Sequence, residues 1–495
     1  MMMNDLKECY ISELDHRLSD KNIQCIMTNT DEAISAMNNG IRPLYVCIKG
    51  TKYDSHNDIP RLIEAGLTDI VAQYIPENTV IPENVNIIMS DNTRITLALA
   101  SKIYYGSPDE SLTMIGITGT KGKTTVSYMI EGVLRESGIK CGIIGTNGVI
   151  FDGKSYECDN STPGAHEYYR YLREMVDSGV THVVCEVTSQ ALKQYRTYGT
   201  IFDIAAFTNL SEDHIGKDEH ADIEEYRQCK GKLFENCRRA VLNMDDTHCG
   251  YFSDICRSYA VDMSLFSLID KNADHYCSRI KPKCFYSKFR YNGKGAVVGL
   301  PGYFNVQNAM CAAAILEKLG IKDRFIRKGI ANIKVPGRCE SVPNPAGINI
   351  IIDYAHTGKS LENILSALKK DCRGKLYCVF GAGGDRSHLR RAAMGEAASK
   401  YADHLFITSD NPRSEEPMSI IDDIIKGIPS DHTNHTVIID REKAIYEALA
   451  MAKKGDTVLL AGKGTQTYQE VCGIKYPFDE REKVSQYYNN LIIQR

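Results

Sequence analysis

Several features that are common in proteins are missing from this sequence. It has no tryptophan, no C-x-x-C pair among its 17 cysteines, and no run of 18 apolar residues. Scattered cysteines, odd in number, fit neither a disulfide framework nor a structural zinc site, so we expect reduced thiols and a cytoplasmic location. The missing apolar run excludes a membrane-spanning helix, and the N-terminus lacks the apolar segment of a signal peptide.

Net charge is also nearly absent, at −4 over 495 residues. Such a balance gives no general attraction to nucleic acid or to an anionic membrane, so we expect neither as a partner. Any anionic ligand must be held by a local site. The length predicts about three globular domains of ~150 residues each.

Three stretches of different texture give the predicted domains 1–108, 109–337 and 338–495. The first has short apolar segments around a helical pattern, which predicts a small α/β domain. The second repeats strand, glycine-rich turn and helix, which predicts a parallel sheet covered on both faces. The third has five apolar segments that run into polar or glycine-rich turns, which predicts a Rossmann-like open α/β sheet. The polar stretch 104–112 is the predicted linker between the first two domains.

The stretch GITGTKGKTT, residues 116–125, lies between a predicted strand and a predicted helix. Small residues let backbone N–H groups converge on phosphate oxygens, and the helix N-terminus adds partial positive charge. A bland glycine-rich turn is the alternative, because Ile117 stands where the strict P-loop pattern has glycine. The context of strand, GKT and helix favours ATP binding, with Lys123 on the terminal phosphates and the Thr124 hydroxyl on Mg²⁺. The predicted ATP contacts in the loop are Gly119, Thr120, Lys121, Gly122, Lys123, Thr124 and Thr125.

This departure from the strict pattern resembles the loop of the Mur ligase family, TGTNGKT[ST], with Lys121 in place of asparagine. The motifs CEVTSQAL, FTNLSEDH and YRQCKGKLF follow in the family's order. Taken alone, a histidine there would more often be structural and a lysine solvated. The resemblance implies that Thr124, Glu186, His214 and Lys230 hold two Mg²⁺ ions, and that Lys230 carries a carbamate derived from CO₂. It gives the catalytic set as Lys123, Glu186, His214 and Lys230.

The activity implied by the resemblance is ATP-dependent amide formation. A substrate carboxylate attacks the γ-phosphate of ATP, and an amine then attacks the resulting acyl phosphate. Closure of the domains around the substrates would exclude water. The family's residues around the nucleotide outside the loop match Asn308, Arg338, Asp353 and His356.

GAGGDRS and SDNPRSEEP resemble the branch of the family that adds the third amino acid to UDP-N-acetylmuramoyl-L-alanyl-D-glutamate. A diaminopimelate-like diamino acid is expected, because the guanidinium groups of Arg413 and Arg386 suit its distal carboxylate. Against this, Gln466 stands where the family has a glutamate that meets the amine. The implied substrate-binding residues are Thr30, Ser161, Thr162, Thr188, Gln194, Arg196, Arg386, Asp410, Asn411, Pro412, Arg413, Gly462 and Gln466.

Three other functions are weighed against this one. A Mur-type paralogue would join an amino acid to a different carboxylate outside the cell wall, which the departures at Asp31, Gln190 and Gln466 favour. An oxidoreductase binding a dinucleotide at GAGGDR is disfavoured, because Arg386 stands where the third glycine belongs. A non-catalytic nucleotide-binding scaffold would require loss of a member of the catalytic set, and all four members are present.

Overall fold

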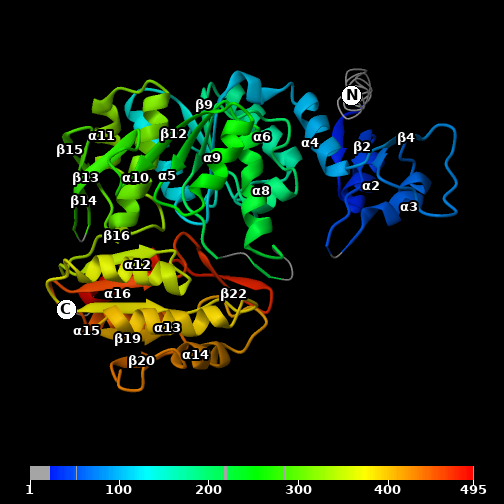
Figure 1. The fold of residues 1–495 in the computed structure, drawn as a ribbon. Helices are drawn as coiled ribbons and strands as arrows, with labels where there is room; N and C mark the ends of the chain where they lie inside the picture. The colour runs from blue at the N-terminus through cyan, green and yellow to red at the C-terminus, as the bar shows by residue number, and fades with distance from the viewer. Residues whose placement is uncertain (1–22, 52, 213–214, 217–219, 284, 494–495) are drawn as a thin grey trace. The chain divides into compact units, whose positions relative to one another are not determined.

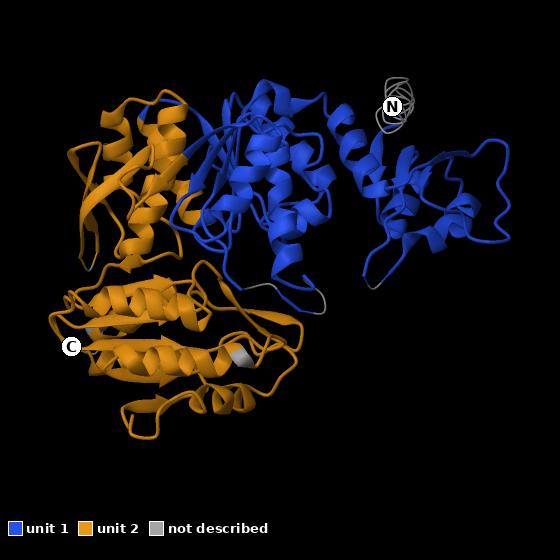
Figure 2. Ribbon diagram, viewed as in Figure 1, with its two compact units in different colours: residues 1–123, 137–264 blue, residues 124–136, 265–495 orange. Residues whose placement is uncertain are grey.

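The computed structural model describes residues 23–493 apart from residues 52, 213–214, 217–219 and 284 (Figure 1). Two compact units divide the chain, residues 1–123 with 137–264 and residues 124–136 with 265–495 (Figure 2). Both are built from helices on parallel-rich sheets, which confirms the predicted α/β class. The predicted boundaries near residues 108 and 337 stay predictions. Within the described part of the chain, no helix is both long and apolar enough to cross a membrane.

A four-stranded parallel sheet begins the first unit (Figure 1). Its strands lie side by side in chain order: β1 (Cys25–Met27), β2 (Pro43–Val46), β3 (Asp69–Ala72) and β4 (Asn86–Met89). Helices α2 (Thr30–Asn38) and α3 (Ile59–Glu64) pack on one face, and α4 (Thr93–Tyr104) packs on the other. The strands are apolar on both faces because both faces are covered.

The predicted linker 104–112 contains more structure than its polar composition suggested. A short 3₁₀ helix, Pro108–Ser111, follows α4, and Asp109 is only 6% exposed. The Lys102 ammonium lies 2.9 Å from the Asp109 carboxylate and also donates to the Gly199 carbonyl, at 2.9 Å. A paired charge can be buried where a lone one cannot, and the partner here comes from the preceding helix.

The larger sheet of the first unit has the order β11-β10-β5-β9-β6-β7-β8. Its strands are β5 (Thr113–Thr118), β6 (Cys141–Gly145), β7 (Gly148–Phe151), β8 (Lys154–Tyr156), β9 (His182–Glu186), β10 (Ile204–Phe207) and β11 (Arg239–Asn243). The central strands are parallel, as predicted, and β7 and β8 form an antiparallel edge. The helices of this part are α6 (Ala165–Asp177), α7 (Ser189–Lys193), α8 (Ile223–Glu235) and α9 (Cys249–Ser258).

The predicted helix after the phosphate loop is α5 (Lys123–Glu136), and one of its faces is apolar. All five residues of that face are fully buried: Val126, Met129, Ile130, Val133 and Leu134. Gly138, two residues after the end of the helix, has a φ of +79°. That left-handed conformation is the one that glycine adopts most easily after a helix.

Four strands that the sequence analysis missed follow α9 along the chain. They are β12 (Asp262–Ser267), β13 (His275–Pro282), β14 (Ser287–Tyr291) and β15 (Lys294–Val298), followed by α10 (Tyr303–Lys318) and α11 (Asp323–Ala331). Strand β14 alternates buried and exposed residues, so it lacks the continuous apolar run that revealed the other strands. Its turn into β15 is an Asn292-Gly293 pair with both φ angles positive, a hairpin signal that the sequence does contain.

The C-terminal sheet has the order β16-β17-β21-β18-β19-β20. Its strands are β16 (Glu340–Val342), β17 (Asn349–Asp353), β18 (Leu376–Phe380), β19 (His404–Ile407), β20 (His435–Val437) and β21 (Thr457–Ala461), and a hairpin of β22 (Tyr468–Val471) and β23 (Ile474–Pro477) follows. The five predicted strands are present and parallel.

Helices cover both faces of this C-terminal sheet (Figure 1). Helices α12 (Gly358–Lys369), α13 (Leu389–Tyr401) and α14 (Pro417–Ile425) cover one face, and α15 (Arg441–Met451) and α16 (Glu480–Ile493) cover the other. Strand order reverses around β21, which pairs with both β17 and β18. In open α/β sheets, ligands bind beyond the carboxyl ends of the strands at such a point.

Candidate active site

The phosphate loop connects the end of β5 to the start of α5, as predicted. Gly119 has a φ of +144°, and a Cβ there would lie 2.0 Å from the Thr208 hydroxyl oxygen. Only glycine therefore allows this close approach of the loop to the end of β10. Asn209, which the sequence analysis did not single out, accepts from the backbone N–H of Lys121 at 3.0 Å and donates to its carbonyl at 3.0 Å. The residues that follow β10 thus hold the loop in place.

Two lysine ammonium groups meet at one backbone oxygen of this loop. Lys123 Nζ donates to the Gly119 carbonyl at 2.7 Å, and Lys230 Nζ donates to the same oxygen at 3.1 Å. Lys230 projects from α8, is 1% exposed, and lies 4.3 Å from the centre of the Tyr226 ring. The alternative of a solvated lysine on a helix surface, which the resemblance disfavours, does not fit this buried position.

Glu186 ends β9, and β9 pairs directly with β5 through a register of Ile117 with Glu186. Its carboxylate is 1% exposed and accepts from the Thr146 N–H at 2.9 Å and the Thr146 hydroxyl at 3.0 Å. A Cβ at Gly145 would lie 2.2 Å from this carboxylate, so the glycine leaves room for it. Hard carboxylate and hydroxyl oxygens are the donors that Mg²⁺ prefers, and Glu186 fits that requirement.

His214, the remaining predicted metal ligand, lies outside the described residues. The structure instead brings together a trio that the sequence analysis did not consider: His220, Glu225 and Cys229 have potential ligand atoms within 4.8 Å of one another. Two of the three already serve other contacts. His220 Nε2 hydrogen-bonds the Ser189 hydroxyl at 2.8 Å, and Glu225 pairs with Lys193 at 2.7 Å.

The residues predicted to contact the carboxyl substrate gather beside Glu186. Thr162 donates to the Glu186 carbonyl at 2.7 Å and lies 3.3 Å from the Thr188 hydroxyl. Arg196 donates to the Thr162 carbonyl at 2.7 Å and, through two nitrogens, to the Gln194 side-chain oxygen at 3.1 and 2.8 Å. Ser161 joins the group through a 2.9 Å contact with the Thr146 hydroxyl. The five predicted residues thus form one network.

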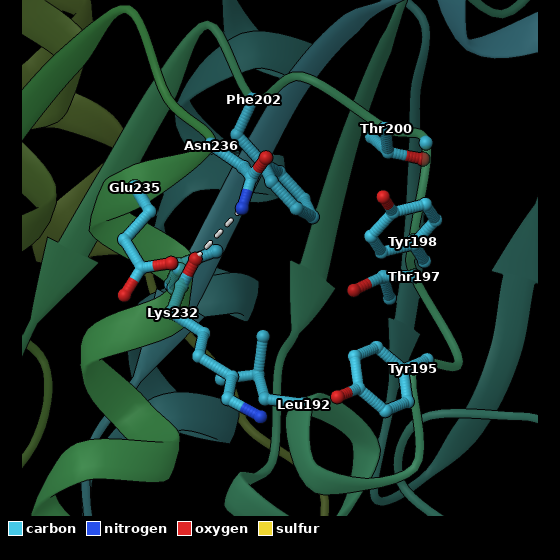
Figure 3. Close-up of a pocket in the computed structure, with 11 residues that line it drawn as sticks. Leu192, Tyr195, Thr197, Tyr198, Thr200, Phe202, Lys232, Glu235 and Asn236 are labelled. Carbon is cyan, nitrogen blue, oxygen red and sulfur yellow. Dashed lines mark hydrogen bonds between the residues drawn. The ribbon is translucent and has the colours of Figure 1, made fainter. Parts of the chain in front are cut away.

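Tyr195 lies between two members of this network and has a φ of +57°, an unusual conformation for an aromatic residue. Its ring lines a cavity of about 240 Å³ together with Tyr198, Phe202 and Lys232 (Figure 3). Lys232 Nζ lies 4.9 Å from the centre of the Tyr195 ring. The described lining contains no residue of the phosphate loop, so this cavity is separate from the predicted nucleotide site.

Thr30, the predicted contact in the first domain, uses its hydroxyl within that domain. It begins α2, is 9% exposed, and lies 2.9 Å from the Tyr45 hydroxyl and 2.5 Å from the Asp58 carboxylate. The neighbouring Asp31 pairs with Arg61 at 2.8 Å on the surface.

In the second unit, the predicted nucleotide residues form two neighbouring groups. Asn308 on α10 donates to the Asn305 side-chain oxygen at 3.2 Å. Asp353, at the end of β17, accepts from the backbone N–H of Cys339 at 2.8 Å, and burial raises the pKa of its carboxyl although Arg338 opposes the shift.

Tyr354 links the other two predicted nucleotide residues. The Arg338 guanidinium lies 4.4 Å from the centre of its ring, and His356 Nδ1 lies 2.7 Å from its carbonyl oxygen. Arg338, Asp353 and His356 therefore occupy one small region beyond the end of β17.

The predicted amino-acid site joins the ends of β19 and β21. Gly462 has a φ of +119°, and a Cβ there would lie 2.5 Å from the Asp410 carboxylate. Lys463, fully buried and absent from the predicted site set, donates to the Asn411 side-chain oxygen at 2.9 Å. Burial lowers the pKa of Lys463, while Asp410, 3.4 Å away, opposes the shift. The side-chain amide of Asn411 in turn donates to the Gln466 side-chain oxygen at 3.0 Å.

The two predicted arginines both lie close to Gly383. A Cβ at Gly383 would be 3.2 Å from Arg413 Nη1 and 3.9 Å from Arg386 Cγ. Arg386 is exposed, whereas Arg413 is partly buried. Pro412, which precedes Arg413, is buried, and its carbonyl would lie 1.9 Å from a Cβ at Gly384. The loop after β18 and the DNPR segment (residues 410–413) therefore pack tightly together.

The comparisons with known proteins agree with this geometry. The Mur ligase middle domain matches residues 117–316, and the Mur ligase glutamate ligase domain matches residues 337–464. A UDP-N-acetylmuramoyl-L-alanyl-D-glutamate--2,6-diaminopimelate ligase of Clostridium perfringens is 38% identical over 89% of this chain and 91% of its own length. The ligase of that description from Clostridium tetani is 36% identical over 97% of this chain and 98% of its own length.

Solved structures extend the comparison. The structure of a 2,6-diaminopimelate ligase is 25% identical, covers 95% of both chains and superposes with a TM-score of 0.67. A folylpolyglutamate synthase of Mycobacterium tuberculosis, 16% identical, covers 81% of this chain and 95% of its own with a TM-score of 0.61, which shows a shared fold alone. The two family matches and the sequence identity along most of its length show that this chain belongs to the Mur ligase family.

Proposed function

We propose that this chain uses ATP to join a diamino acid to a carboxylate of UDP-N-acetylmuramoyl-L-alanyl-D-glutamate in peptidoglycan synthesis. One observation carries the proposal: the phosphate loop, Glu186 and Lys230 converge beyond the paired ends of β5 and β9. The similarity to diaminopimelate ligases supports the choice of substrates. The described cysteines are free, which accords with a cytoplasmic reaction.

The loop would bind the triphosphate through its backbone N–H groups and through Lys123, which would leave the Gly119 carbonyl for the phosphates. A substrate carboxylate oxygen, oriented by the network around Arg196, then attacks the γ-phosphorus, and the bond to ADP breaks. The amine attacks the acyl carbon of the product, loses a proton, and expels phosphate. Such phosphoryl transfer needs mainly positioning and charge stabilisation.

Magnesium fits the oxygen donors beside the loop. Glu186 and the buried Thr124 hydroxyl, together with His214 and a modified Lys230, are the residues that would hold two ions. When bound, Mg²⁺ would neutralise charge on the transferring phosphate. Thr146 fixes both oxygens of Glu186, so this donor is held in place before any ion arrives.

Lys230 suits a carbamate because of its surroundings. Two ammonium groups that share one carbonyl oxygen repel each other, and a carbamate on Lys230 would replace one of these positive charges with a negative one. The neutral Lys230 amine would attack CO₂, form a nitrogen–carbon bond and release a proton. The resulting anion offers oxygen donors to Mg²⁺ and a partner to Lys123.

The three-domain division follows from the same proposal. Residues 1–108 would bind the UDP substrate, residues 109–337 ATP, and residues 338–495 the amino acid. The family matches at 117–316 and 337–464 support the second and third of these assignments.

Phosphate release tests the proposed function. We expect release from ATP only when UDP-N-acetylmuramoyl-L-alanyl-D-glutamate and an amino acid are both present, with the tripeptide product seen by mass spectrometry. Phosphate release that does not depend on both substrates would contradict the proposed function. The absence of release with every amino acid in a panel would contradict it as well.

A Mur-type ligase acting on a different carboxylate is the second candidate. The Thr30 hydroxyl is already engaged by Tyr45 and Asp58, which favours this alternative. Calorimetry with the UDP-substrate separates the two, because the alternative predicts no binding of the UDP-sugar.

A further inference from the structure

The DNPR segment and the hairpin β22–β23 are joined by backbone hydrogen bonds. The Arg413 N–H donates to the Glu470 carbonyl at 3.1 Å, and the Cys472 N–H donates to the Arg413 carbonyl at 2.7 Å. Arg413 itself has a φ of +52°, an uncommon conformation for a residue with a long side chain. These contacts fix Glu470 beside Arg413, and the two side chains pair at 3.3 Å between Nε and Oε2.

The side-chain orientation of Gln466 follows from the donors around Asn411. The Asn411 oxygen accepts from Lys463 Nζ at 2.9 Å and from the Glu470 N–H at 3.0 Å, and both of these groups are pure donors. The Asn411 nitrogen must then donate, so it is the oxygen of Gln466 that faces it, at 3.0 Å. Gln466 is left with its NH₂ group for a ligand, and that group cannot accept a hydrogen bond from an ammonium.

Glu470 places a carboxylate beside Arg413. The Glu470 and Arg413 side chains are 25% and 24% exposed, so a ligand can reach both. Arg413 Nη1 donates to the Gly384 carbonyl at 2.6 Å. Among the described residues, neither Arg413 Nη2 nor Glu470 Oε1 has a hydrogen-bond partner. The pair therefore presents one donor edge and one acceptor oxygen side by side.

We propose that Glu470, rather than Gln466, receives the distal ammonium of the amino-acid substrate. This inference rests on the proposed function, in which Arg413 receives the distal carboxylate of a diaminopimelate-like amino acid. A carboxylate at Arg413 and an ammonium at Glu470 place four charges in alternation, and each charge gains a charge-assisted hydrogen bond. Lysine has no distal carboxylate to bind Arg413, and 2-aminopimelate has no distal ammonium to bind Glu470.

Steady-state kinetics of the full chain with two amino acids test this inference. Diaminopimelate carries the distal amine, and 2-aminopimelate has the distal carboxylate without that amine. In Glu470→Gln we expect the KM for diaminopimelate to rise by roughly tenfold or more, because one charge-assisted hydrogen bond is lost. We expect kcat for diaminopimelate and the KM for 2-aminopimelate to change by less than about twofold. Glu482→Gln, at an exposed position of α16, is the matched control.

Each outcome separates the two ideas. An unchanged KM for diaminopimelate in Glu470→Gln, or an equal rise for both amino acids, would overturn the inference and leave the proposed function standing. A wild-type chain that releases no phosphate with either amino acid would overturn the proposed function and the inference with it. The thermal unfolding curve of each variant shows whether the C-terminal sheet remains folded.

Discussion

The phosphate loop and the DNPR segment both follow parallel strands, yet they hold their functional groups in different ways. At the loop, the backbone determines the geometry of the site, because Gly119 has no room for a Cβ beside Thr208. At the DNPR segment, side chains determine the geometry, through hydrogen bonds that run from Lys463 to Asn411 and from Asn411 to Gln466. We infer from this difference that the ATP chemistry depends on a short motif, whereas the proposed amino-acid site could exchange one side chain for another while its backbone stays the same.

Replacing Lys123 tests the loop side of this comparison with the largest expected effect. In Lys123→Ala we expect phosphate release to fall about 1000-fold, because the cation that meets the phosphates is lost. Lys154→Ala, an exposed lysine of β8, is the control. Activity of Lys123→Ala within about tenfold of wild type would contradict the assignment.

Replacing Lys230 tests the carbamate. We expect the native mass of the wild-type chain to exceed the sequence mass by one CO₂, and Lys230→Ala to lack that increment and lose roughly 100-fold in rate. Small added anions should restore part of the rate. Lys232→Ala, from the same helix, should keep both the increment and the activity. A fully active Lys230→Ala would refute the carbamate.

Replacing Gly145 tests the position of Glu186 without replacing a charged residue. In Gly145→Ala the new methyl would meet the Glu186 carboxylate at 2.2 Å and displace it. We expect the Mg²⁺ concentration for half-maximal activity to rise roughly tenfold, as expected when a metal ligand is disturbed. Gly250→Ala, where no atom lies within 4 Å of the added Cβ, is the control. An unchanged Mg²⁺ requirement would separate Glu186 from the metal.

Replacing Arg391 should have the smallest effect on activity and a visible effect on stability against pH. Arg391 is 1% exposed and holds Glu415 through contacts of 2.7 and 2.8 Å, which lower the pKa of Glu415. A carboxyl with a lowered pKa stabilises the fold above its unfolded pKa of about 4.3 and loses that stabilisation as pH falls.

Thermal melts between about pH 6 and pH 3 check this prediction. We expect the Tm of the wild-type chain to fall more steeply with acid than that of Arg391→Met, which should already melt lower at pH 6. Parallel curves for the two proteins would show that the Arg391–Glu415 contact contributes nothing to the acid response.

Local patterns predicted the parts of the fold that depend on local sequence. The predicted strand, loop and helix around residues 116–125 all matched, because continuous apolar runs and a 3.6-residue period are visible in a short window. Strands β13 to β15 were missed since their outer faces are exposed and polar.

The proposed amino-acid site could be predicted only in part. The motif identified Arg413 and the departure at Gln466, but the hairpin that brings Glu470 back to Arg413 depends on contacts between segments 57 residues apart. Lys463 stands out in the sequence as a charged residue just after a predicted strand, but its complete burial became evident only in the structure. Side-chain networks of this kind are set by tertiary structure, which a short window does not contain.

The transfer of a labelled oxygen tests the central claim most directly. A carboxyl substrate carrying heavy oxygen in its reacting carboxylate is incubated with ATP, the amino acid and the full chain. If the chain activates the carboxylate as an acyl phosphate, one labelled oxygen per turnover appears in the released phosphate. Phosphate released without the label, while the amide product forms, would contradict the account.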